Sequence, residues 1–532
     1  MRLVSRLPHQ ARRSWRWKWF SGVAAVNSLT AVLRSLRWTG VDVGVKGRVV
    51  NVVGMADHDR TVVVGEPVSA ESGVTMAVEA ARHAAVWWAA RGHAERRRRL
   101  MSWKRYIVAH MDDLAAVMVR ETGKPLADSL LEITLGVEHL DWAARNARWV
   151  LRPRRLSSGK SMINISSRQE YLPLGVVGVI GPWNYPVFTP LSSIGQALAA
   201  GNAVVFKPSE HTLGVGGWLA DAFAAVNGEH PVLRVVTGGG AVGAALCRAG
   251  VDKIAFTGST ATARRVMAAC AETLTPVLIE AGGKDAMVVA ADADVDEAAA
   301  AAVWGGMVNA GQTCIGVERV YVVDSVYPEF LRRVTEMASG LRLGEHYGPM
   351  TVPGQLDVVR RHVSDAVNAG GRAVLGGVES VRPPWVHPVV LTDVPETCSA
   401  LTEETFGPVI VVNRVADVDE AVRRANDSSY GLGSAVFTRD RRAALAIARR
   451  LRTGGTAINS VITFATVPAL PFGGVGGSGF GRVHGDAGLK EFSLSKGITR
   501  QLFRSPLNLT TFDRTSRDVS IAMRLVRLLH GR

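Results

Sequence analysis

The fold is decided by the stretch Gly175-Val176-Val177-Gly178-Val179-Ile180-Gly181-Pro182-Trp183-Asn184-Tyr185-Pro186. A short apolar run predicts a buried strand, and the glycine and prolines after it predict a turn. Further short apolar runs follow at 203–207, 233–236, 254–256, 277–280 and 286–289, and a helix is expected at 191–200. Strands that alternate with helices predict a parallel sheet covered on both faces, and ligands bind beyond the carboxyl ends of such strands.

A second alternation of strands and helices follows Cys314. The expected strands are 317–323, 374–377, 389–391, 408–412, 433–437 and 455–458, and the expected helices are 328–341, a helix from Asp417, and 441–451. Ahead of the first sheet, helical periodicity predicts helices at 78–94, 97–118 and 126–150. The run Glu121-Thr122-Gly123-Lys124-Pro125 predicts a helix end. The fold class is therefore α/β, with two bodies preceded by helices.

The charge of the chain is concentrated at its two ends. The net charge is +15 over 532 residues, of which 47% are hydrophobic. Residues 1–50 carry ten Lys and Arg against the single acid Asp42, and residues 501–532 carry six Arg against two Asp. The body between them is close to neutral, so no nucleic-acid partner is expected. Basic ends indicate contact with an anionic surface.

Both basic ends also carry apolar residues. The run Trp15-Arg16-Trp17-Lys18-Trp19-Phe20 alternates indole rings with cations, which is typical of a membrane interface. Near the C-terminus, Arg517, Arg524 and Arg527 fall on one helical stripe, with apolar residues on the remaining face. Peripheral membrane contact is one interpretation of both ends. The alternatives are a poorly ordered extension at the N-terminus and an oligomer contact at the C-terminus.

Four cysteines, Cys247, Cys270, Cys314 and Cys398, are too few and too scattered for a disulfide framework or a zinc site. No metal is therefore expected, and a reduced cytoplasmic compartment is the natural interpretation. No apolar run reaches the ~18 residues of a spanning helix, and the N-terminus makes a poor signal peptide. Membrane association through the basic ends stays open.

Three marked motifs follow one another along the chain. They are Leu278-Ile279-Glu280-Ala281-Gly282-Gly283-Lys284, Asn309-Ala310-Gly311-Gln312-Thr313-Cys314-Ile315 and Glu403-Glu404-Thr405-Phe406-Gly407-Pro408. A lone cysteine is usually inert, but a thiol beside a base becomes a nucleophile, and Glu280 is the candidate base for Cys314. In this order and at this separation, the three motifs resemble the aldehyde dehydrogenase superfamily.

The resemblance covers roughly residues 70–500. It implies a Rossmann-like parallel-sheet cofactor domain, a second α/β catalytic domain, a small bridging element, and assembly as a homodimer or homotetramer. The corresponding parts of this chain are 1–50 (basic N-terminal extension), 51–281 (NAD(P)-binding domain, with bridging strands near 152–170), 282–480 (catalytic domain), 481–500 (bridging segment) and 501–532 (basic amphipathic tail).

The resemblance also implies the catalytic roles. Cys314 would attack an aldehyde carbonyl, and the Asn184 amide would donate to the resulting oxyanion. Glu280 would activate the water that hydrolyses the thioester. A structural carboxylate salt-bridged to Lys284 is the alternative for Glu280. Because relatives that transfer the acyl group to coenzyme A usually lack this glutamate, its presence favours a free acid as product.

The implied cofactor is NAD, with NADP as the alternative. A carboxylate at Glu210 accepts from ribose hydroxyls and repels a 2′-phosphate, whereas Lys207 could help to bind one. Ser259 is expected to cap the helix 263–273, whose N-terminus would receive the pyrophosphate. The residues implied to bind the cofactor are Ile180, Gly181, Pro182, Trp183, Lys207, Ser209, Glu210, Gly240, Gly243, Phe256, Thr257, Gly258, Ser259, Gly282, Glu404 and Phe406.

The loop from Val461 to Leu470 lines the substrate entrance in the family. Here it is apolar and contains no Arg or Lys, which favours a neutral, hydrophobic aldehyde. Much of the chain also resembles succinate-semialdehyde dehydrogenases, so an NADP-dependent enzyme of that kind is one alternative. A membrane-associated relative that has lost turnover is the other, although Cys314, Glu280 and Asn184 are all present.

Overall fold

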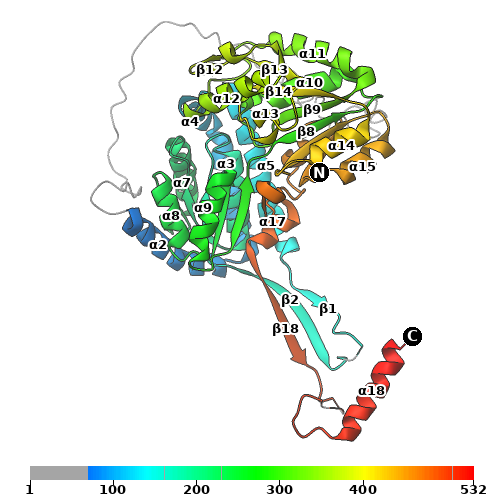
Figure 1. The fold of residues 1–532 in the computed structure, drawn as a ribbon. Coiled ribbons are helices and arrows are strands. Elements are labelled where there is room, and N and C mark those ends of the chain that lie inside the picture. The colour runs from blue at the N-terminus through cyan, green and yellow to red at the C-terminus, as the bar shows by residue number, and fades with distance from the viewer. Residues whose placement is uncertain (1–69, 161, 229, 506, 508, 532) are drawn as a thin grey trace, which may run out of the picture.

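The computed structural model describes residues 70–531, with the exception of 161, 229, 506 and 508 (Figure 1). The predictions for residues 1–50 lie outside the described residues. The described chain forms two α/β bodies, a three-stranded sheet that projects from them, and a helix at the tip of the projection.

Four helices precede the first sheet. They are α2 (Ala70–Ala90), α3 (Gly92–Ala109), α4 (Met111–Thr122) and α5 (Leu126–Val150). The single helix predicted at 97–118 is wrong, because α3 ends at Ala109 and the backbone of the next residue, His110, leaves the helical region with φ −122° and ψ 27°. The end predicted at Gly123 is confirmed. Its φ of +72° is left-handed, and a Cβ there would lie 2.6 Å from the ring of Pro349.

The first body contains a six-stranded sheet. In spatial order its strands are β17 (Gly479–Phe480), β7 (Val277–Ala281), β6 (Lys253–Gly258), β3 (Val176–Ile180), β4 (Ala203–Lys207) and β5 (Leu233–Val235). The connecting helices are α6 (Phe188–Ala200), α7 (Leu213–Asn227), α8 (Gly240–Arg248) and α9 (Thr260–Ala271). All strands except β17 are parallel. From β3 the chain adds β4 and β5 on one side and then β6 and β7 on the other. The strand order therefore reverses between β3 and β6, where ligands bind in such sheets.

The second body contains a seven-stranded sheet. In spatial order its strands are β10 (Arg372–Leu375), β13 (Val389–Thr392), β14 (Val409–Val415), β9 (Val317–Val323), β8 (Asp285–Val289), β15 (Gly433–Phe437) and β16 (Gly455–Ile458). Its main helices are α10 (Val295–Met307), α11 (Tyr327–Ser339), α12 (Gly354–Asn368), α14 (Val418–Asn426) and α15 (Arg441–Arg450). Smaller elements are the hairpin β11 (Val381–Arg382) and β12 (Trp385–Val386), and the single turns α13 (Ser399–Thr402) and α16 (Thr463–Thr466). Only β10 runs antiparallel to its neighbour in this sheet.

The projecting sheet joins two distant parts of the chain. Its strands are β1 (Arg154–Leu156), β2 (Ile165–Pro173) and β18 (Ser493–Gln501), in that order, and α17 (Gly485–Glu491) leads into β18. The strands expected near 152–170 and after Leu489 are therefore present. That they bridge subunits stays a prediction, as do the domain boundaries.

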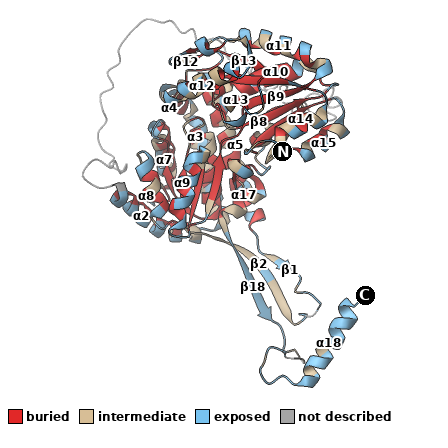
Figure 2. Ribbon diagram, viewed as in Figure 1, coloured by how far each residue is buried: buried red, intermediate tan, exposed pale blue. Residues whose placement is uncertain are grey.

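Burial separates the two bodies from the projection. Both large sheets are buried, whereas much of the projecting sheet and the helix α18 (Ser516–His530) is exposed (Figure 2). None of the α18 residues is buried. Among the described residues, no helix is both long and apolar enough to cross a membrane.

Candidate active site

The turn before Cys314 has a strained backbone. In the 3-10 turn η2 (Val308–Gly311), Asn309, Ala310 and Gly311 all have positive φ, at 55°, 57° and 71°. Such a conformation is costly for residues with a side chain and persists only where its surroundings hold it. Asn309 Nδ2 holds it by donating to the Asn184 and Gln312 carbonyls at 3.1 and 3.2 Å. A Cβ at Gly311 would lie 2.1 Å from the Gly407 carbonyl, so the cysteine motif is packed directly on the Glu403–Pro408 motif.

Asn184 connects the first body to this turn. Its side-chain Nδ2 donates to the Gln312 carbonyl at 2.9 Å, and the residue is buried. The neighbouring Tyr185 hydroxyl lies 2.8 Å from Thr313 Oγ1. An amide nitrogen carries two N–H groups, and within the described residues only one of those on Asn184 has a partner. The second is free to donate to an oxygen bound beside Cys314.

Glu280 lies at the carboxyl end of β7 and is fully buried. Burial raises its pKa to about 7, and a hydrogen bond of 3.0 Å from Thr257 Oγ1 opposes the shift. The alternative of a salt bridge to Lys284 is wrong, because the Lys284 ammonium pairs with Glu318 on β9 and also donates to Thr405 Oγ1. The Glu280 carboxyl therefore has no cation as partner among the described residues and titrates near neutral pH.

Carboxyl groups surround Cys314. Burial raises the pKa of its thiol well above the usual value, and the charges of Glu280, Glu404 and Asp285 raise it further, with Glu280 the largest of the three. The structure thus brings Cys314, Glu280 and Glu404 together from three separate motifs. In this arrangement the resting thiol is protonated, with burial as the largest cause and the charge of Glu280 as the next.

Glu404 is held against the glycine pair that links β7 to β8. Its Oε1 accepts from the Gly283 N–H at 3.1 Å, and a Cβ at Gly282 would lie 2.0 Å from its carboxylate. Burial, with Glu318 nearby, raises the pKa of Glu404 to about 8. The backbone of the next two residues, Thr405 and Phe406, is fixed as well, because both of their N–H groups donate to the Glu318 carboxylate. Only glycine at 282 leaves room for this carboxyl.

The other predicted cofactor residues lie around the reversal point of the first sheet. Ile180 ends β3, and Gly181, Pro182 and Trp183 follow it; Lys207 ends β4, with Ser209 and Glu210 after it; Phe256, Thr257 and Gly258 end β6. Ser259 caps α9 by accepting from the Thr262 N–H, so the predicted cap is confirmed, although α9 begins at Thr260 rather than Ala263. Phe406 from the second body meets Trp183 edge-on, with ring centroids 5.4 Å apart.

This arrangement fits a dinucleotide. Lys207 Nζ lies 3.6 Å from Glu210 Oε2, beside the first turn of α8. A Cβ at Gly243 would come within 3.7 Å of the Lys207 side chain, whereas Gly240 has nothing within 4 Å of its own missing Cβ. The glycines here leave the backbone of α8 open to close approach by a ligand. The capped N-terminus of α9 offers amide groups to a pyrophosphate.

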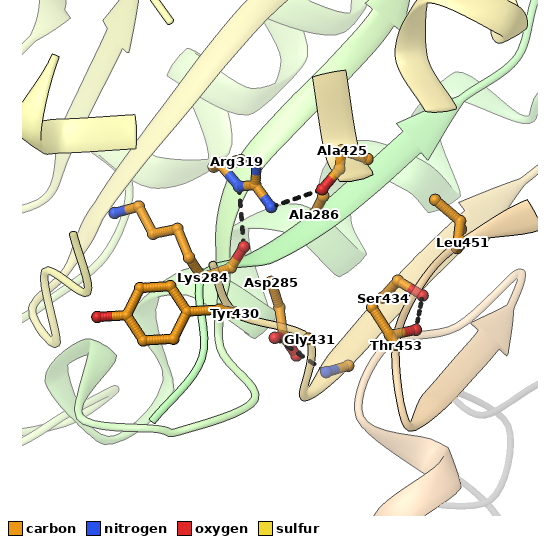
Figure 3. A pocket seen from close by; sticks show the side chains of 11 residues that line it. Lys284, Asp285, Ala286, Arg319, Ala425, Tyr430, Gly431, Ser434, Leu451 and Thr453 are labelled. Atoms are coloured by element: carbon orange, nitrogen blue, oxygen red, sulfur yellow. Dashed lines mark hydrogen bonds between the residues drawn. The ribbon is translucent and has the colours of Figure 1, made fainter. Parts of the chain in front are cut away.

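Asp285 was not among the site residues predicted from the sequence. It lines a cavity of about 10 Å³, about the size of one water molecule, together with Lys284, Arg319, Tyr430 and Ser434 among others (Figure 3). One carboxyl oxygen accepts from the Gly433 N–H at 3.0 Å and the other, buried, has no partner among the described residues. Burial raises the pKa of Asp285 to about 7. An acidic residue opening an apolar strand was the available signal.

The predicted entrance loop lies beside the nucleophile. A second cavity of about 10 Å³ is lined by Val461, Ile462 and Phe464 from this loop and by Ile315, the neighbour of Cys314. Phe464 is stacked on Phe472, with centroids 6.1 Å apart. The walls that the loop contributes next to the nucleophile are therefore apolar and aromatic.

Comparison with known proteins agrees with this geometry. A model described as the aldehyde dehydrogenase family matches residues 48–498. The chain belongs to the aldehyde dehydrogenase family. It is 39% identical to a 4,4'-diapolycopene aldehyde oxidase from Methylomonas, over 80% of this chain and 81% of that protein. It is 36% identical to a probable succinate-semialdehyde dehydrogenase [NADP(+)] from Sinorhizobium fredii, over 74% of this chain and 81% of that protein.

Solved aldehyde dehydrogenases have the same fold. An NAD-dependent aldehyde dehydrogenase from Sinorhizobium meliloti superposes with a TM-score of 0.79 at 33% identity, over 83% of this chain and 89% of that one. Lactaldehyde dehydrogenase from Escherichia coli superposes with a TM-score of 0.77 at 30% identity, over 80% of this chain and 91% of that one. The predicted α/β fold and the reaction class are thereby confirmed: this aldehyde dehydrogenase is an NAD(P)-dependent oxidoreductase.

Replacing Glu280 by Gln should stabilise the protein at alkaline pH. Because folding raises the pKa of Glu280 from 4.5 to about 7, stability is lost progressively as the pH rises from 4.5 to 7, and the loss is complete above pH 7. We expect the free energy of unfolding to rise by on the order of 1–3 kcal/mol at pH 8. Melting temperatures at pH 5 and pH 8 measure this, with the exposed Glu138→Gln as control. Equal or lower stability of Glu280→Gln at pH 8 would contradict the assignment.

Proposed function

We propose that this aldehyde dehydrogenase oxidises a hydrophobic aldehyde to the free carboxylic acid, with Cys314 as nucleophile and Glu280 as base. The observation that carries the proposal is the convergence on one thiol of a buried carboxyl with a pKa near 7 and an amide with a free N–H. These are the three groups that acyl chemistry on a thiol requires: nucleophile, base and oxyanion donor.

Cys314 is the nucleophile in the first step. The Glu280 carboxylate takes the thiol proton and then releases it to solvent, and the sulfur of the resulting thiolate bonds to the aldehyde carbon and forms a thiohemiacetal. The carbonyl oxygen becomes an oxyanion, which the free N–H of Asn184 and the backbone N–H of Cys314 stabilise. Each such donor lowers the barrier by about 3 kcal/mol. A bound nicotinamide would supply the acceptor for the hydride that leaves the carbon, and a thioester would then remain on the Cys314 sulfur.

Glu280 is the general base in the second step. A carboxylate with a pKa near 7 is ionised in a large fraction of molecules at neutral pH and is still basic enough to take a proton from water. The activated water attacks the thioester carbon, and the carbon–sulfur bond breaks to release the acid and the Cys314 thiolate. This step distinguishes hydrolysis from transfer of the acyl group to another thiol.

We propose NAD as the preferred cofactor of this NAD(P)-dependent enzyme. Lys207, Ser209 and Glu210 would hold the adenosine ribose, the N-terminus of α9 the pyrophosphate, and Glu404 and Phe406 the nicotinamide end. The carboxylate of Glu210 lies beside Lys207 and would repel a 2′-phosphate. The relatives themselves are divided, since one is named for NADP and another for NAD.

The substrate class follows from the entrance loop. Val461, Ile462 and Phe464 give it an apolar wall, and it contains no Arg or Lys. The relative with 39% identity is named for 4,4'-diapolycopene aldehyde, which supports a hydrophobic substrate here as well. Succinate semialdehyde is the competing substrate suggested by other relatives. Its carboxylate needs a cation that this loop does not supply.

We further propose that α18 rests on a membrane surface. Val519, Leu525, Val526 and Leu528 all expose at least 42% of their surface, and Arg517, Arg524 and Arg527 lie on the same helix. A helix with an exposed apolar face and several cations suits the interface of an anionic bilayer. A membrane would also concentrate a hydrophobic aldehyde near the enzyme.

We propose assembly as a homodimer or homotetramer through the projecting sheet. Leu156 on β1 and Leu494 and Ile498 on β18 are exposed, and the outer edge of β18 carries no neighbouring strand in the described chain. Exposed apolar strands with a free edge are normally covered by another chain.

The reaction can be tested by following NADH formation with decanal, benzaldehyde and succinate semialdehyde. We expect decanal with NAD to give the highest kcat/KM. Cys314→Ala should lose turnover by about 1000-fold or more, because no other group can form the thioester. The control Cys398→Ala removes a thiol outside the site. Turnover retained by Cys314→Ala, or succinate semialdehyde with NADP as best pair, would contradict the proposal.

Membrane contact can be tested by removing residues 502–532. Sedimentation with vesicles of phosphatidylcholine and phosphatidylglycerol should retain the full chain and release the truncated one, while turnover of soluble propanal stays the same. The full-chain variant Ser520→Glu alters the polar side of α18, whereas Leu525→Glu places a charge on its apolar side and should weaken binding more. Equal binding of the full and truncated chains would rule out this role.

A further inference from the structure

A buried ion pair lies on the far side of the Asn184 loop from the cysteine. Lys124 Nζ and Glu132 Oε2 are 2.5 Å apart, and each side chain is only 1% exposed. Lys124 follows the glycine that ends α4, and Glu132 lies on α5. Burying two charges costs several kcal/mol per ion unless further hydrogen bonds satisfy both groups. The location of those further bonds indicates what the pair does.

The remaining bonds of the pair end on one loop. Lys124 Nζ donates to the Asn184 carbonyl at 2.9 Å and lies 4.3 Å from the centroid of the Tyr185 ring. Glu132 Oε1 accepts from the Val187 and Phe188 N–H groups at 2.8 and 3.1 Å. One ion pair therefore holds the loop between β3 and α6 at its middle and at its junction with α6, and the prolines at 182 and 186 stiffen the loop further.

The ion pair acts most directly on the peptide group of Asn184. Its carbonyl accepts from Lys124 on one side and from Asn309 on the other, while its side chain donates to Gln312 two residues before the nucleophile. Moving this peptide would swing the free N–H away from the place where the carbonyl oxygen of the substrate lies. Misplacement of a reacting group by 1 Å can cost about 100-fold in rate.

We propose that Lys124 and Glu132 are positioning residues that hold the Asn184 amide for oxyanion stabilisation. The proposal rests on the oxyanion role of Asn184 proposed above. Neither side chain reaches the thiol or the cofactor residues in the structure. Their effect is expected on the rate of the chemical steps, and binding of the dinucleotide should be unaffected.

The double variant Lys124→Met/Glu132→Leu tests this without leaving a lone buried charge. Replacing both members of a buried pair by apolar residues is often neutral for stability, whereas removing one is strongly destabilising. We expect a folded enzyme with unchanged quenching of its tryptophan fluorescence by NADH and a kcat about 10-fold or more lower. The control is Lys253→Met/Glu491→Leu, which removes a 2.6 Å ion pair between the amino end of β6 and α17. It should leave kcat unchanged.

Combination with Asn184→Ala distinguishes positioning from a general structural effect. Alone, Asn184→Ala should lower kcat by about 100-fold or more. If the ion pair acts through Asn184, the triple variant loses no more than Asn184→Ala does, whereas independent effects multiply. Multiplied losses, or a double variant as fast as wild type, would overturn the positioning role. An Asn184→Ala enzyme as fast as wild type would instead overturn the oxyanion role on which it rests.

Discussion

The hydrogen bond from the Asn184 amide to the Gln312 carbonyl joins the two α/β bodies at the point of chemistry. One partner follows the central strand of the first sheet, and the other directly follows the left-handed turn that precedes Cys314. That turn exists only because the Asn309 side chain bonds across it and because Gly311 allows contact with the Gly407 backbone. The strain at Asn309 and Ala310 is thus balanced by bonds to two other motifs, which makes the position of the thiol depend on both bodies.

Low polarity gives the site its reactivity. Burial raises the pKa of Glu280 to about 7 and that of Glu404 to about 8, and these carboxyls in turn raise the pKa of the Cys314 thiol. The resting site therefore favours the uncharged forms of these groups. A carboxyl kept near pH 7 is a useful base, but its ionisation opposes folding. In the proposed mechanism, function and stability are therefore in conflict at Glu280.

Much of the fold could be predicted because buried parallel strands are continuous apolar runs. The strands 203–207, 317–323, 433–437 and 455–458 are confirmed at both ends. Sheet order, the break at His110 and the buried pairs Lys284–Glu318 and Lys124–Glu132 were not predicted. They depend on contacts between residues distant in the chain or on backbone geometry. The proposed roles of Cys314, Glu280 and Asn184 come from motifs, whereas Asp285 and Glu318 belong to no such motif and lie at the starts of β8 and β9.

In the proposed mechanism Glu280 activates the water that hydrolyses a thioester formed on Cys314. Intact-protein and peptide mass spectrometry of the Glu280→Gln enzyme after mixing with decanal and NAD tests this step. We expect an added decanoyl group on the peptide that contains Cys314, with about one NADH formed per site before turnover stops. Absence of the adduct, its location on another cysteine, or continued turnover at the wild-type rate would contradict it.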